Sequence, residues 1–321
     1  MAIVGFLIRR ILTGIVVVWL VASGAFLLFF ARPVATVARQ LAGRAATPQV
    51  INEVIRNLGL NQPIAVQYWH FIDNLLHGNL GFSYYTGESV DTMVRQDLPP
   101  TASLLVGALI LWLVVGLGVG IISATRARSA FDRVSNVGVL IGLSMPTFVI
   151  GELLILYIFL PLQEHGFHWI NTGYAGPSQG LSPWVGHMLL PWITLAAVQA
   201  AVYTRLSRGQ LLDTLGEDFI RTARAKGLSE RRVLFRHAVR AALTPVVSQL
   251  GVDIGQLLGG AVVVETVFGL GGLGQVSVQA IETDNLPVII GFVVFAAVFV
   301  VLANIVVDMV YALLDPRVRI S

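Results

Sequence analysis

Six long apolar runs constrain this chain more than any other feature of its sequence. They lie at about 11–31, 103–124, 134–160, 187–206, 244–268 and 288–314, and few charged residues interrupt them. A helix of about 20 residues crosses a hydrocarbon core of roughly 30 Å, because each residue adds about 1.5 Å to its length. We therefore predict an all-α integral membrane protein with six transmembrane helices.

The composition agrees with membrane residence and excludes several other classes of protein. Hydrophobic residues make up 55% of the 321 and charged residues only 12%, about half the charged share of a soluble domain. The mean hydropathy is +0.78 and the pI is near 9.5. The basic residues lie in short segments beside the apolar runs, so we interpret them as topology signals and expect no nucleic-acid binding. The chain has no cysteine, which excludes disulfides and thiolate metal sites.

The distribution of Lys and Arg predicts how the helices are oriented, because cytoplasmic loops retain positive charge. Sixteen of the 21 basic residues fall on one side of the predicted topology. Nine of the sixteen lie in or beside the connection between the fourth and fifth runs, and the rest lie at the chain ends or between the second and third runs. We predict a multi-pass protein of the cell (inner or plasma) membrane with both termini in the cytoplasm.

Two connections are longer than simple loops, and they suggest a domain organisation. The outer one, residues 32–100, contains amphipathic stretches at 50–60 and 67–81, which predict short helices in a small extracytoplasmic domain. It follows an N-terminal helix within 1–31. Residues 101–314 would form a core of five further membrane helices, and 315–321 a cytoplasmic tail.

The connection at about 207–242, between the fourth and fifth runs, has the pattern of two short helices. Glu217 and Asp218 supply a cap and negative charge at the start of the first helix, and Gly227 suits a left-handed residue at its end. Ser229 can cap the second helix. A short amphipathic helix of this kind suits docking into a groove on another protein. The alternative is a solvated basic loop that only determines topology.

Within this connection, DFIRTARAKGL at 218–228 resembles the coupling-helix segment of ABC importer permeases of the dipeptide and oligopeptide family. Further stretches are similar to the same family: LGLNQPIAVQY at 58–68, GNLGFSY at 78–84, LPPTASL at 98–104, LSMPTF at 143–148 and LDPRVR at 314–319. The resemblance covers nearly the whole chain. It indicates the first, or B-type, of the two transmembrane subunits.

The resemblance implies which residues couple transport to an ATPase. The family pattern is Glu-Ala-Ala, three residues and Gly; Gly227 fits it, while Arg221 and Thr222 replace the Glu and the first Ala. The segment at 31–39 lacks a Gly-Asp-Pro that members often carry, and this absence counts against a role of the segment in docking a binding protein. The implied coupling residues are Asp218, Phe219, Arg221, Thr222, Ala223, Arg224, Ala225, Lys226 and Gly227.

Other motifs do not predict an enzyme. GLGGLG at 269–274 satisfies GxGxxG, but a membrane helix is expected before it where a dinucleotide fingerprint needs a strand. The longer stretch VVETVFGLGGLG at 263–274 instead resembles the family's outer gate region. No GxxxxGK[ST] or HExxH occurs, and the pair His165 and His168 beside Glu164 lacks further metal ligands. We expect no catalytic, cofactor or metal site.

Acidic residues inside apolar runs are costly and are therefore candidates for function. They are Glu152, Asp253, Glu265 and Asp308. Gln249 and Gln256 share a helical face with Asp253 and, together with Glu265, would line the translocation pathway or seal a subunit interface. These two possibilities remain open.

The resemblance implies import of di- or oligopeptides by alternating access. The implied partners are a second homologous permease, two P-loop ATPase subunits that bind ATP and Mg²⁺, and an extracytoplasmic peptide-binding protein. Family relatives that carry nickel chelates or glutathione are an alternative. An ion-coupled secondary transporter using Asp253 and Glu152, or a membrane scaffold without a pathway, would explain the loop helix less well.

Overall fold

The computed structural model describes residues 2–30, 33–42, 46–57, 59–83 and 85–314. The predicted tail at 315–321 lies outside them. Six helices of the described chain are long and apolar enough to cross a membrane, and this confirms the predicted all-α fold with six spans. The candidate spans are Ile8–Leu28, Val90–Thr125, Thr147–Glu164, Leu181–Leu215, Glu230–Phe268 and Leu286–Val307.

The chain forms two compact units, one comprising Met1–Pro99 with Gly271–Val306 and the other Pro100–Leu270 with Val307–Ser321. Two long helices, α5 (Val90–Thr125) and α14 (Leu286–Leu314), contribute residues to both units. The first unit also contains α1 (Ala2–Phe30), α2 (Val34–Ala42), α3 (Pro48–Asn57), α4 (Ile64–Leu76), a hairpin of β1 (Phe82–Ser83) and β2 (Glu88–Ser89), and α13 (Leu273–Glu282).

In the first unit, the two amphipathic stretches of the sequence form α3 and α4. The buried side chains Val37 of α2, Val54 of α3 and Leu286 of α14 belong to one hydrophobic cluster, which also includes Ala25 of α1. In the hairpin, Phe82 pairs with Ser89 and Ser83 with Glu88 in antiparallel register. The apolar faces of these short helices therefore pack beside the ends of two membrane spans.

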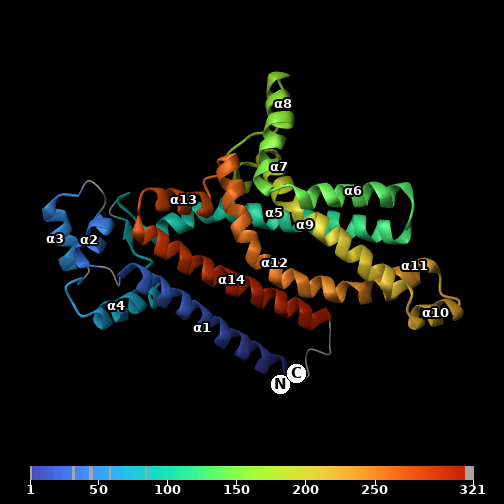
Figure 1. Cartoon of the computed structure of the whole chain (residues 1–321), viewed down its shortest axis with the longest axis horizontal. Coiled ribbons are helices and arrows are strands. Elements are labelled where there is room, and N and C mark those ends of the chain that lie inside the picture. The colour runs from blue at the N-terminus through green and yellow to red at the C-terminus, as the bar shows by residue number, and fades with distance from the viewer. Residues whose placement is uncertain (1, 31–32, 43–45, 58, 84, 315–321) are drawn as a thin grey trace. The chain divides into compact units, whose positions relative to one another are not determined.

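The second unit is built around α9 (Leu181–Leu215), which packs against α6 (Ala130–Ser144), α7 (Thr147–Leu154) and α12 (Val239–Phe268) (Figure 1). Its smaller elements are a π-helix at Ile155–Phe159, α8 (Leu160–Glu164), a 3₁₀ turn at Pro177–Gln179, α10 (Asp218–Ala225), α11 (Glu230–Arg232) and a second π-helix at Val233–Ala238.

Small residues let α5 approach α9 closely. A Cβ added to Gly116 would lie 2.7 Å from the Cβ of Tyr203, closer than side chains tolerate. The Ser207 hydroxyl donates to the Gly116 carbonyl at 3.3 Å and also to Tyr203 O at 2.6 Å. Close packing through small residues is a common way to join membrane helices.

The third apolar run is not the single helix that we predicted over 134–160. It is divided between α6 and α7 by Met145, which is extended (φ −102°, ψ 127°), and Pro146. Proline has no N–H for the helical ladder, and its ring disfavours helical dihedrals at the preceding residue. The candidate span consequently begins only at Thr147.

Candidate functional site

In the segment between α9 and α11, the backbone conformation fixes where α10 begins and where it ends. Glu217 is the extended residue before the helix (φ −69°, ψ 150°), and its carbonyl accepts the N–H groups of Ile220 and Arg221. Its side chain makes no capping hydrogen bond, whereas Asp218 places a negative charge in the first turn. Gly227 follows the helix with φ +75°, so the predicted left-handed terminating glycine is confirmed.

One face of α10 is anchored and the other is open. Ile220 (0% exposed) and Ala223 (7%) are buried in a cluster with Leu211 of α9, Val233 of the second π-helix and Ala242 of α12. The remaining eight predicted coupling residues are exposed, including the aromatic ring of Phe219 at 47%. This arrangement presents a short helix for contact while it is held by both neighbouring spans.

An ion pair spans the turn that follows α10. Arg224 donates through Nε to Glu230 Oε1 at 2.9 Å and through Nη2 to Oε2 at 3.4 Å. Within the helix, the weaker pair of Arg221 with Asp218 spans 3.4 Å, and both side chains are largely exposed. The bidentate pair adds a geometric restraint to the turn at Gly227.

The second short helix predicted in this connection is not separate from the fifth span. Ser229 is extended, but its side chain makes no capping bond. The residues that follow pass from α11 through the π-helix Val233–Ala238 into α12, so one helical run extends over Glu230–Phe268. The described connection thus contains one separate short helix, α10, and the long helical run Glu230–Phe268 begins a few residues after it.

Asp132, at the start of α6, is a highly connected carboxylate of the second unit. It accepts Nε and Nη2 of Arg208 at 2.7 and 2.9 Å, the main-chain N–H of Arg128 at 2.8 Å, and the hydroxyl of Ser123. Asn136 donates to the same group at 3.1 Å. The hydrogen bonds from Arg208 and Ser123 hold the pKa of Asp132 well below its ordinary value.

Asp132 joins three helices: its own α6, α5 through Ser123, and α9 through Arg208. Sequence reasoning missed this role. The available signal was a lone acid in the basic connection that carries Arg126, Arg128 and Arg133, three residues after a capping Ser129. Its partner, 76 positions away, has no local signal.

Along α12, the structure brings together two of the three polar residues predicted to share a face. Asp253 is 4% exposed, and Gln249 donates to its Oδ1 at 2.9 Å. Gln256 is exposed. Asp253 therefore faces the interior of its own unit in this conformation.

A buried polar group from α9 lies beside Asp253. Tyr203 is fully buried and lies close enough to Asp253 for its hydroxyl to interact with the carboxylate. Trp112 of α5 packs on the tyrosine with ring centroids 5.8 Å apart. Buried polar groups are stabilised by such pairing, so Tyr203 links α9 to the polar face of α12.

The other acids occupy different environments. Glu265 is 0% exposed and accepts the Thr101 hydroxyl at 2.6 Å. Glu152 is exposed on α7, and the side chain of Asp308 lies outside the described part. Among the described residues, no group of three or more His, Cys, Asp or Glu could hold a metal ion.

The glycine-rich stretch after α12 follows a helix, as the sequence predicted. Gly269 ends α12 in the left-handed region (φ +64°), and the Leu270 N–H donates back to Glu265 O at 3.0 Å. This is a helix-terminating turn. The strand that a dinucleotide fingerprint requires is not present at this position.

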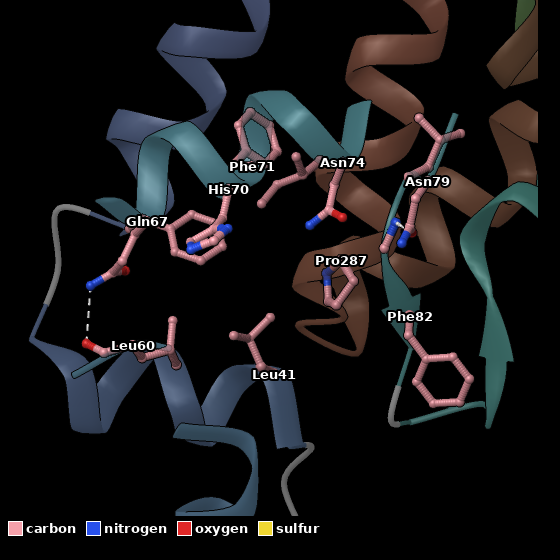
Figure 2. A pocket seen from close by; sticks show the side chains of 13 residues that line it. Leu41, Leu60, Gln67, His70, Phe71, Asn74, Asn79, Phe82 and Pro287 are labelled. Atoms are coloured by element: carbon pink, nitrogen blue, oxygen red, sulfur yellow. Dashed lines mark hydrogen bonds between the residues drawn. The ribbon is translucent and has the colours of Figure 1, made fainter. Parts of the chain in front are cut away.

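The first unit contains a cavity of about 210 Å³. Gln67, His70 and Asn74 of α4 line it; Figure 2 shows His70 and Asn74 directed into it and Gln67 turned toward Leu60, with Leu41 and Pro287 on other sides. Its walls are mostly apolar, and Gln67 Nε2 is already engaged with the carbonyls of Leu60 and Gln62 at 3.0 and 2.8 Å.

Six candidate spans, together with a short exposed helix anchored between the fourth and the fifth, define a membrane permease. The chain belongs to the family of binding-protein-dependent transport system inner membrane components. The model of that family matches residues 116–320, and the model of its N-terminal region matches residues 3–105.

Curated relatives match over almost their whole lengths. The chain is 37% identical to a probable peptide ABC transporter permease protein, y4tP, of Sinorhizobium fredii, over 98% of this chain and 99% of the relative. It is 36% identical to the glutathione transport system permease protein GsiC of Escherichia coli K12, and 37% identical to that of Pectobacterium atrosepticum, over 98% of each chain. Each of these relatives is described as a permease protein.

Proposed function

We propose that this chain is one of two transmembrane subunits of an ATP-driven importer of short peptides, and that residues 218–227 dock onto an ATPase subunit. The observation that carries the proposal is α10: eight of its nine candidate coupling residues are exposed while Ile220 and Ala223 anchor it. The chain's similarity to a probable peptide ABC transporter permease supports the peptide assignment.

The charge distribution supports a cytoplasmic position for α10. Arg221 and Arg224 lie on it and Lys226 follows it, and sixteen of the 21 basic residues share its side of the proposed topology. Both chain ends would then be cytoplasmic, and the short helices between the first and second spans would lie outside.

The packing of α10 supports a mechanical role. Its anchor residues pack in one cluster with the end of α9 and the start of the run that continues into α12. A displacement of α10 would therefore move the fourth and fifth spans together. α9 has 35 residues, or roughly 50 Å of helix. A helix longer than the hydrocarbon core of about 30 Å can transmit displacement from the membrane surface into the bilayer.

Two observations support the proposed partners: the chain has no P-loop motif, and its family is described as binding-protein-dependent. No P-loop motif occurs in the chain, so two separate ATPase subunits would bind ATP and Mg²⁺. Closure of those subunits would drive alternating access in a pair of permeases, this chain and a homologous second one. An extracytoplasmic binding protein would deliver the peptide.

Glutathione is the second candidate substrate, because several relatives are glutathione permeases. Glutathione is itself a tripeptide, so both candidates belong to one chemical class. Competition between labelled dipeptides, longer peptides and glutathione for uptake by the assembled complex would separate them.

The test is affinity purification of the tagged full chain in mild detergent, followed by identification of co-purifying subunits and an ATPase assay. We expect a second permease and P-loop ATPases. Phe219→Ala combined with Arg221→Ala should release the ATPases, while the matched change of Gly209→Ala on α9, which meets open space, should retain them.

The proposal would be overturned if the chain purified without any ATPase and an ion gradient, not ATP, drove its transport of peptide. In that case Asp253 and Glu152 become the residues to test as ion sites.

A further inference from the structure

Helix α4 presents three different faces, and two of them have partners within the first unit. The first packs on α1: the Tyr68 hydroxyl hydrogen-bonds Ser23 at 2.7 Å, and its ring lies 5.3 Å from that of Phe26. Phe71 lies 5.4 Å from Phe26 on the same side. The second face carries Gln67, His70 and Asn74, which line the cavity of Figure 2.

The third face is apolar, and all of it except the half-buried Ile72 is exposed. Ala65, Trp69, Ile72 and Leu76 recur at intervals of four, three and four residues, which places them in one narrow stripe because successive residues turn by about 100°. Trp69 is 70% exposed and Leu76 79%. The stripe contains no charged side chain; Asp73 lies beside it, toward the polar face. An exposed apolar stripe on one helix face is typical of an interaction surface.

The position of α4 along α1 indicates what covers the stripe. Its contacts fall on Ser23, Phe26 and Phe30, at the end of the candidate membrane span Ile8–Leu28. In that stretch α1 itself exposes Leu27 (57%) and Leu28 (69%). The exposed apolar surface of α4 therefore belongs to a helix that packs at the end of a membrane span, where the span itself is apolar and exposed.

We propose that α4 is an interfacial helix that lies in the membrane surface, with the stripe Ala65–Trp69–Ile72–Leu76 inserted at the boundary between headgroups and acyl chains. Tryptophan favours this depth because its ring is apolar and its indole N–H is polar. An amphipathic helix lies there with its apolar face toward the lipid and its polar face toward water. The lipid surface thus holds the first unit close to the bilayer and orients its cavity.

The natural absence of cysteine allows a direct test with single spin labels. The variants Trp69→Cys, Ile72→Cys and Leu76→Cys probe the stripe, and His70→Cys and Asn74→Cys on the cavity face of the same helix are matched controls. Each full-length chain is reconstituted in nanodiscs of phosphatidylcholine and phosphatidylglycerol. Collisions of the label with oxygen, which partitions into lipid, are compared with collisions with a water-soluble nickel chelate.

We expect the ratio of oxygen to nickel collisions to be several-fold higher at 69, 72 and 76 than at 70 and 74. Frequent nickel collisions along the stripe would overturn the proposal, because they mean that the stripe faces water. Shielding of the stripe from both reagents would also overturn it, because a protein would then be the cover. Leu76→Cys, at the last and most exposed position, provides the test if Trp69→Cys does not fold.

Discussion

At the residue scale, Asp132 should stabilise the second unit more than any exposed ion pair does. Replacement by Asn removes the carboxylate that accepts both nitrogens of Arg208 and leaves that guanidinium without its charged partner. We expect Asp132→Asn to lower the thermal unfolding midpoint in detergent, and the double variant with Arg208→Gln to lower it by less than the sum of the two single changes.

The contribution of Asp132 to the free energy of unfolding should decrease at low pH. Its pKa is lowered in the folded protein, whereas in the unfolded chain an Asp titrates near pH 3.9. The stabilisation is therefore complete above about pH 4 and is lost as pH falls toward the folded pKa. The gap in unfolding midpoint between wild type and Asp132→Asn should narrow below about pH 4; a constant gap down to pH 3 would contradict the assignment.

Gly227 should be intolerant of substitution for conformational reasons alone. Its φ is +75° and no atom lies within 4 Å of an added Cβ, so any penalty comes from the backbone and not from crowding. We expect Gly227→Ala to cost about 1–2 kcal/mol locally and to weaken peptide-stimulated ATPase activity of the complex. Gly227→Asn should cost less, since Asn tolerates the left-handed region; equal effects of Ala and Asn would argue against a conformational cause.

At the element scale, the two faces of α10 should separate stability from coupling. Ile220→Ala removes a fully buried side chain and should reduce the free energy of unfolding by about 2–5 kcal/mol. Phe219→Ala, on the exposed face, should change stability by no more than about 0.5 kcal/mol while it reduces ATP-driven uptake. Chemical denaturation and uptake assays on the two variants test this; if Phe219→Ala left uptake unchanged, the exposed face would not be a docking surface.

At the scale of the whole molecule, the proposed orientation predicts which exposed positions react from outside. Tyr85, in the hairpin connection, is 56% exposed, and Glu217 is exposed before α10. A membrane-impermeant maleimide should label Tyr85→Cys in intact cells and Glu217→Cys only after permeabilisation. The reverse pattern would invert the topology and remove α10 from the cytoplasm.

The sequence by itself determined the fold class, the number of membrane spans and the left-handed end of α10. These depend on local properties: apolar run length sets a membrane span, and a glycine after an amphipathic stretch ends a helix. The break at Met145–Pro146 was also available locally, but the apolar run concealed it because hydropathy does not detect a missing N–H.

Only the tertiary structure decided which polar groups meet. Asp132 and Arg208 are 76 residues apart, and Thr101 and Glu265 are 164 apart, so no periodicity predicts either pair. The burial of Asp253 against Tyr203, and the continuation of α11 into α12, likewise depend on how α5, α9 and α12 pack. Desolvation and pairing of a polar group depend on neighbours that the fold supplies, and these lie far away along the chain.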